Sequence, residues 1–446
     1  MTKISITTLG CPKNTVDSGH LAKRFISAGF VHTDVNDADI ILINTCGFIR
    51  EAKEESIEEI LRLSEMKIET GAKKLVVFGC LAKRYRDELL REIPEIDSIW
   101  GVGEEEKIIE YCKKVESGVK KFELGKKGIS DFVLLNSELG TRNSQSYAYL
   151  KIAEGCNKKC TFCVIPSIRG RFKSIPPEDI LKEAEDYIQN GIKELILVAQ
   201  DITSYGREFD GYNLVSLLKD MASINGDFHI RLLYLYPTAI DDNLLDCIAG
   251  EEKIYKYLDI PLQHSEDRLL RLMGRRGTRK EYIKLIRNIR RTIPGVVLRT
   301  TFIVGFPTET EEDFNGLVDF IEDIRFDRLG VFKYSKEEGT PAYRLKGQVP
   351  VKVKERRFDD IMKRQALISL EKNRELIGKR YEALIDEVNG GIAIARLYSH
   401  APEIDGAVII EKSEVKAGDV VTVEIVEAFD YDLRGILVKG NADSRR

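Results

Sequence analysis

Three cysteines on one short loop constrain this chain more than any other feature of its sequence. They stand in the segment Cys156-Asn-Lys-Lys-Cys160-Thr-Phe-Cys163, directly after a predicted strand. Thiolates are the ligands that iron–sulfur clusters require, and three of them can bind three irons of a cubane, which leaves the fourth iron open. Structural zinc usually takes four ligands, and no nearby cysteine or histidine completes such a set. The spacing therefore favours an iron–sulfur cluster over zinc.

From Tyr147 onwards, short apolar runs alternate with amphipathic helical patterns. Six strands are predicted, in the segments AYLKIA, ELILVA, HIRLLYLY, YLDIPL, VLRTTFIVGF and RLGVFKYS. Such alternation is typical of a parallel sheet. We expect an α/β domain in the form of a partial (β/α)6 barrel of the TIM type, with an open sheet as the alternative. Functional loops of such a barrel lie at the carboxyl ends of its strands.

The first part of the chain carries a second set of three cysteines. Each follows a predicted strand, and they are Cys11, Cys46 and Cys80. In a parallel α/β sheet the carboxyl ends of the strands open onto one face, so the three thiols should converge there. Each also has a glycine beside it, which permits close backbone approach: Gly10, Gly47 and Gly79. Three buried core cysteines are the simpler alternative, but the repeated position favours a second three-thiolate cluster.

A chain of 446 residues is too long for one core and predicts two or three domains. We place them at residues 1–140, 141–373 and 374–446. The first is a parallel α/β domain, and the second ends in a basic connector helix. Short alternating strands after residue 374 predict a small antiparallel β-barrel.

Composition limits the environment of the protein. The net charge of -4 and the pI of about 6.0 give no general attraction for nucleic acid. No apolar run approaches the ~18 residues of a membrane span, and polar residues interrupt the apolar start of the chain. We therefore predict a cytoplasmic protein with no membrane partner. Cys112 and Cys247 lie in helical patterns and are predicted to be core or surface thiols.

Longer segments around both cysteine sets resemble one enzyme family. They are LGCPKNTVDS, INTCGFIREAKEESI, VVFGCLAKRY, GCNKKCTFCVIPSIRGR, LDIPLQH, LRTTFIVGFP and FKYSKEEGTPA. Over essentially the whole chain they are similar to the methylthiotransferase family of radical S-adenosylmethionine (SAM) enzymes. The resemblance implies a methylthiotransferase N-terminal domain, a radical SAM domain and a TRAM domain. The last is an OB-like barrel that often binds RNA.

The resemblance also implies cofactors and their ligands. In that family two 4Fe-4S clusters and SAM are used. The cluster on Cys156, Cys160 and Cys163 would cleave SAM to a 5'-deoxyadenosyl radical, which abstracts hydrogen from the substrate. The auxiliary cluster on Cys11, Cys46 and Cys80 would present sulfur, which a second SAM methylates. A flavodoxin or ferredoxin electron donor is implied as well.

Eight further positions are implied as contacts of SAM, mostly at strand ends. They are Phe162, Gln200, Asp201, Gln263, His264, Ile303, Gly305 and Tyr334. A polar residue at a strand end is often only a helix cap or a turn former, so that alternative stays open for each of them.

Members of this family differ in their substrate. One branch modifies an aspartate β-carbon in the twelfth protein of the small ribosomal subunit, whereas others modify adenosine in transfer RNA. The Pro12-Lys13 pair and the segment APEIDG at 401–406 resemble the first branch. The last domain is acidic, which suits a basic ribosomal protein better than RNA phosphates. The basic connector keeps a ribosomal RNA contact open. Outside the family, the rival is a non-catalytic iron–sulfur or zinc protein that binds RNA.

Overall fold

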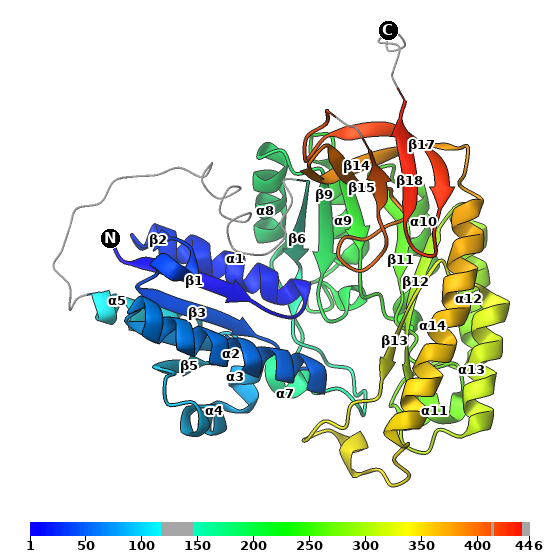
Figure 1. The fold of residues 1–446 in the computed structure, drawn as a ribbon. Helices are drawn as coiled ribbons and strands as arrows, with labels where there is room; N and C mark the ends of the chain where they lie inside the picture. Colours follow the sequence, from blue (N-terminus) through cyan, green and yellow to red (C-terminus); the bar gives the residue numbers. More distant parts are fainter. Residues whose placement is uncertain (117–145, 412–413, 439–446) are drawn as a thin grey trace.

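The computed structural model describes residues 1–116, 146–411 and 414–438. Within these ranges the chain forms two parallel sheets flanked by helices and one small barrel (Figure 1). The domain boundary predicted at residue 140 lies outside the described residues. No helix in the described ranges is both long enough and apolar enough to cross a membrane.

The first sheet has five parallel strands in the order β2-β1-β3-β4-β5. Their bounds are Lys3–Thr8 (β1), Val31–His32 (β2), Ile40–Thr45 (β3), Lys74–Gly79 (β4) and Ser98–Trp100 (β5). The helices are Pro12–Ser27 (α1), Arg50–Thr70 (α2), Cys80–Arg84 (α3), Arg86–Glu92 (α4) and Glu105–Glu116 (α5). Strand β3, of sequence IILINT, is buried along its whole length, as expected for a parallel strand covered on both faces. The predicted α/β unit is confirmed.

The second sheet has six parallel strands in the order β13-β12-β11-β10-β9-β6. Their bounds are Tyr147–Lys151 (β6), Glu194–Val198 (β9), His229–Leu232 (β10), Ile254–Asp259 (β11), Val297–Val304 (β12) and Arg328–Lys333 (β13). The helices are Ile165–Arg169 (α7), Pro177–Gln189 (α8), Leu214–Ser223 (α9), Asp242–Gly250 (α10), Asp267–Leu272 (α11), Arg279–Thr292 (α12) and Glu311–Ile324 (α13). Two short antiparallel strands flank α7: Ala153–Glu154 (β7) comes before it and Lys173–Ser174 (β8) after it. All six predicted strands are present, and the sheet stays open, as a partial barrel does.

The connector is the helix Val351–Arg374 (α14), which packs beside β13 (Figure 1). Several of its cations are paired with acids of the second domain. Arg356 lies 2.7 Å from Glu311, and Lys372 lies 2.7 Å from Asp327. The guanidinium of Arg357 lies 2.9 Å from Glu309. Much of the positive charge that kept an RNA contact open is therefore neutralised within the protein.

The last domain is a closed barrel in the order β14-β15-β16-β18-β17. Its strands are Arg380–Asn389 (β14), Ile392–Arg396 (β15), Val408–Ile410 (β16), Val420–Ala428 (β17) and Leu433–Leu437 (β18). The predicted small barrel is confirmed. It is not wholly antiparallel, because β16 and β18 pair in parallel.

Acidic side chains of this barrel bind the second domain. Tyr147 donates to Glu403 over 2.9 Å, and Tyr257 donates to Asp405 over 2.7 Å. In the other direction, Arg396 of the barrel lies 2.6 Å from the buried Glu194. Some of the acidic side chains that were predicted to attract a basic partner therefore stabilise the contact between the two domains instead.

Candidate active site

The first trio of thiols gathers where three strands of the N-terminal sheet end. Cys11 caps the start of α1, Cys46 follows β3 directly, and Cys80 opens α3 after β4. Their packing is close: a Cβ atom on Gly10 would lie 2.9 Å from Cys46 Sγ, and one on Gly47 would lie 2.8 Å from the backbone nitrogen of Leu81. The glycines are therefore needed where the sequence predicted close approach.

Burial dominates the acidity of these thiols. It raises the pKa of Cys46 to about 12 and that of Cys80 to about 11, and the neighbouring Cys11 contributes to both shifts. The three thiols are thus within electrostatic reach of one another. Because metal ligation needs thiolates, cluster assembly here must displace protons.

The second trio lies on the loop between β7 and α7. The backbone N–H of Lys158 donates to Cys156 Sγ over 3.4 Å, and Arg275 Nη1 lies 4.0 Å from Cys160 Sγ. Burial raises the pKa of Cys163 to about 12, and Cys160 and Cys156 add to the shift. The loop is fixed from outside by a bond from the backbone N–H of Thr161 to the carbonyl of Met273, at 2.9 Å.

Each trio offers three thiols, as a site-differentiated cubane requires. Among the described residues, no group of three or more His, Cys, Asp or Glu side chains is close enough to hold a single metal ion. The all-thiol donor sets have the chemistry that iron–sulfur clusters take.

Helix α7 joins the two trios. It begins two residues after Cys163. Val164, just before the helix, and Ile168 within it pack against Cys80 in one apolar cluster. At its end, Arg169 Nη2 donates to Asn14 Oδ1 over 2.6 Å, and Cys80 Sγ lies 4.0 Å from the same oxygen. The two trios therefore lie on the same side of the molecule, on either side of one short helix.

A buried group of charges surrounds this junction. Arg169 lies 3.0 Å from Asp17 and 2.9 Å from Glu154, and Lys151 pairs with the same two acids. Burial opposes charge on Asp17, but Lys151 and Arg169 hold its pKa below the ordinary value. Gln200 donates to Glu154 over 3.3 Å. Arg169 lies in the family-like segment GCNKKCTFCVIPSIRGR but is not among the site residues predicted from the sequence.

Several of the predicted SAM contacts gather beside the second trio. Ile303 and Tyr334 belong to one apolar cluster, and Phe162 of the triplet packs against it. Within the described residues, the buried polar atoms Gln200 Oε1, His264 Nε2 and the Tyr334 hydroxyl lack a hydrogen-bond partner. Buried polar groups are nearly always satisfied, so orphans at three predicted contacts fit a ligand that completes them.

The other predicted contacts have local structural roles. Asp201 accepts from the backbone of Thr203 at 3.1 Å and pairs with Lys158 at 3.1 Å, so it serves as the cap that we had kept as an alternative. Gln263 and Gly305 have positive φ values of 73° and 71°, and Gln263 also pairs with Phe302 in an isolated parallel bridge. Burial lowers the pKa of His264 to about 3, which keeps its ring neutral. Their contacts with SAM stay predictions.

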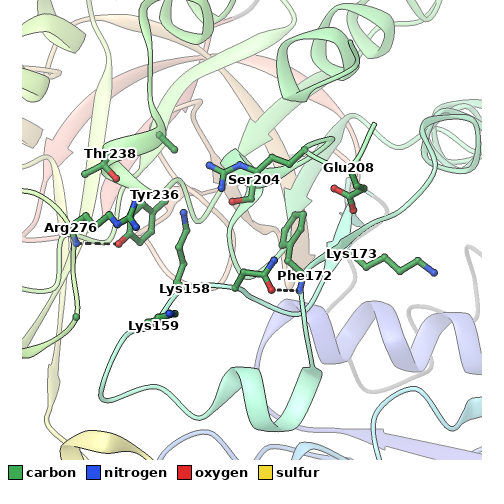
Figure 2. Close-up of a pocket in the computed structure, with 13 residues that line it drawn as sticks. Lys158, Lys159, Phe172, Lys173, Ser204, Glu208, Tyr236, Thr238 and Arg276 are labelled. Carbon is green, nitrogen blue, oxygen red and sulfur yellow. Dashed lines mark hydrogen bonds between the residues drawn. The ribbon is translucent and has the colours of Figure 1, made fainter. Parts of the chain in front are cut away.

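A cavity of about 790 Å³ lies behind the triplet loop (Figure 2). Five cations line it against one acid, Glu208, and they are Lys158, Lys159, Lys173, Arg207 and Arg276. The Lys158 ammonium lies 3.9 Å from the ring centre of Tyr236, and the guanidinium of Arg275, next to Cys160, stacks on the same ring at 4.3 Å. The loop that carries the second trio is therefore one wall of a cationic cavity, which sequence reasoning did not predict.

Three family descriptions match successive parts of the chain. Residues 3–101 match the uncharacterized protein family UPF0004, residues 150–321 match the radical SAM superfamily, and residues 377–438 match the TRAM domain. These matches agree in order with the three structural units.

Curated relatives match over nearly the full length. The chain is 59% identical to ribosomal protein uS12 methylthiotransferase RimO of Thermodesulfovibrio yellowstonii, over 98% of this chain and 100% of that protein. It is 45% identical to the protein of the same name from a Thermoanaerobacter species, with 98% and 100% covered.

Solved structures share the fold at low identity. TsrM, a radical SAM methyltransferase from Kitasatospora setae, aligns with a TM-score of 0.56 at 13% identity, over 88% of this chain and 81% of that one. The cobalamin-dependent radical SAM enzyme OxsB aligns with a TM-score of 0.53 at 15% identity, over 81% and 56%.

Proposed function

This chain belongs to the RimO family of ribosomal protein uS12 methylthiotransferases, and from that premise we propose that it adds a methylthio group to an aspartate β-carbon of uS12. The observation that carries the proposal is the meeting of two thiol trios across α7. One trio serves SAM cleavage and the other serves sulfur transfer, and such a division needs both on one side of the molecule. The proposal places the enzyme in the cytoplasm, where ribosomes are made.

The β-carbon of an aspartate offers no acidic proton and no leaving group, so acid–base catalysis cannot functionalise it. A 4Fe-4S cluster on Cys156, Cys160 and Cys163 would supply, with SAM, the radical chemistry that can. The residues of the chain itself would position SAM and the two thiol trios relative to one another. The apolar cluster of Phe162, Ile303 and Tyr334 would hold SAM and exclude water, and α7 fixes the second thiol trio relative to the first.

A direct test compares the two substrate classes of the family. We expect the reconstituted enzyme, with SAM and dithionite, to add a methylthio group to a uS12 peptide and to leave transfer RNA unchanged. Mass spectrometry of both substrates reads the result. A methylthio group on adenosine alone would instead establish the transfer RNA activity. Absence of 5'-deoxyadenosine and of protein-bound iron would favour a non-catalytic protein.

The proposed electron donor, a flavodoxin or ferredoxin, finds support in the cationic cavity. The lining residues Lys159, Lys173, Arg207 and Arg276 are exposed, on a chain whose net charge is -4. A cleft lined by one sign of charge attracts partners of the opposite sign and speeds their encounter. Because the triplet loop is a wall of this cavity, an acidic carrier docked there would be close to the cluster that it reduces.

Charge reversal in the cavity tests this docking site. We expect the triple variant Lys159→Glu, Arg207→Glu, Arg276→Glu to slow reduction of the cluster by flavodoxin hydroquinone by about 10-fold or more at low salt. Reduction by dithionite should stay unchanged, because so small a reductant needs no docking surface. Stopped-flow absorbance of the flavin measures the first rate, and bleaching of the cluster absorbance measures the second.

A matched control carries the same change of charge elsewhere. Lys280, Lys284 and Arg287 are exposed on α12, and their reversal to glutamate should leave both rates as in the wild type. Equal slowing in the two triple variants would show that the effect comes from the change in net charge and not from a docking site in the cavity. An unchanged rate in the cavity variant would place the docking site elsewhere.

A further inference from the structure

Lys13 is a buried cation beside the first thiol trio. It is the second residue of α1, two positions after Cys11, and only 7% of its surface is exposed. Its ammonium lies 3.7 Å from the ring centre of Tyr234, a residue that follows β10 at the mouth of the second sheet. Lys13 therefore lies where the N-terminal cluster loop meets the radical SAM domain.

Two acids on the elements beside it are already occupied. Asp17, one turn further along α1, pairs with Lys151 and Arg169. Asp259, which accepts from the backbone N–H of Tyr234 at 3.0 Å, lies 3.0 Å from Arg299. Among the described residues no carboxylate forms an ion pair with Lys13.

A buried ammonium that no carboxylate pairs is costly, because buried charges are ordinarily paired. An aromatic ring compensates only part of the lost hydration. Such a group is rarely kept for stability, since an apolar side chain of similar length would fill the same space. Its persistence beside Cys11 fits a role toward an anion that arrives from outside.

We propose that Lys13 binds the side-chain carboxylate of the substrate aspartate and thereby selects a protein substrate. This inference rests on the proposed function. The carboxyl carbon of aspartate is bonded to the β-carbon, so the group that is bound and the atom that reacts are adjacent. A carboxylate held at Lys13 would bring the β-carbon to the side of the site where Cys11 stands.

The same contact would disfavour a nucleoside. An adenine base carries no negative charge, so its entry would leave the Lys13 ammonium buried without a carboxylate partner. Specificity often arises in this way, from a buried polar group that the wrong substrate fails to satisfy.

Peptide binding to the iron-loaded enzyme tests the proposal without turnover. We expect the wild type to bind a fluorescent uS12 peptide with the target aspartate about 10- to 100-fold more tightly than the same peptide with asparagine. In Lys13→Gln and Lys13→Met this preference should vanish, whereas Arg24→Gln, an exposed position on the same helix, should keep it. Fluorescence anisotropy gives the dissociation constants.

A second measurement separates binding from structure. If Lys13 serves the substrate, Lys13→Met should unfold at the same temperature as the wild type or higher, because a buried charge is removed. A lower melting temperature, or a preference for aspartate that survives in both variants, would overturn the proposal. So would a loss of transfer RNA binding in place of peptide binding. Failure of the wild type to modify the peptide would instead contradict the proposed function.

Discussion

Replacing Cys11, Cys46 and Cys80 together by alanine is expected to halve the iron content, from about eight to about four atoms per chain. Methylthio transfer should fall to background, because no thiolate remains to hold the auxiliary cluster. Formation of 5'-deoxyadenosine should persist, since Cys156, Cys160 and Cys163 stand on a separate loop. Iron and sulfide assays, with chromatography of the SAM products, measure the three quantities.

The two remaining cysteines provide the control. Cys112 and Cys247 are buried in α5 and α10 and contact neither trio in the described residues. The double variant Cys112→Ala, Cys247→Ala should keep about eight irons and both activities. Iron that stays near eight in the triple variant, or iron that is lost from the control, would refute the assignment of the first trio.

The grouping of six cysteines into two trios followed from the sequence because it depends on local pattern. Strand periodicity places Cys11, Cys46 and Cys80 after strand ends. Because parallel strands end on one face of the sheet, the three thiols are predicted to lie together. The same reasoning gave the six strands of the second sheet. Both predictions needed only short segments and their order.

What the sequence did not reveal depends on contacts between distant segments. Arg169 and Asn14 are 155 positions apart, and no periodicity connects them. The paired cations of α14 and the acids Glu403 and Asp405 carried the expected charge, but their partners lie within the protein. Net charge predicts which partners a domain attracts only where its charged groups are free.

Asp201 illustrates a different limit. Its place after a strand suited both a SAM contact and a turn cap; its bonds to Thr203 and Lys158 show the cap, and its contact with SAM stays a prediction. Lys13 shows the reverse case. The sequence marked it as a feature of one branch, but only its burial and the pairing of its neighbours suggest what it does.

The junction at α7 leads to the second large expected effect. The Arg169 side chain is only 1% exposed and contacts Asn14, Asp17 and Glu154. Removal of one partner from a buried ion network costs about 3 to 5 kcal/mol. Arg169→Gln should therefore lower the melting temperature by on the order of 10 °C. Differential scanning calorimetry of the iron-loaded enzyme measures the shift.

The same variant should uncouple the two half-reactions. With Arg169 replaced, α7, which follows Cys163 and packs against Cys80, loses its bond to Asn14, so the two thiol trios are no longer held in fixed relation. We expect 5'-deoxyadenosine to form at a near-normal rate while methylthio transfer falls about 10-fold or more, since small displacements at a reacting centre have large kinetic effects. Arg169→Lys should show an intermediate loss, because one ammonium cannot replace a planar guanidinium that spans three acceptors. Arg171→Gln, two positions on and exposed, should match the wild type in melting temperature and in the ratio of the two products. Equal loss of both products in Arg169→Gln would show that Arg169 supports only the local fold.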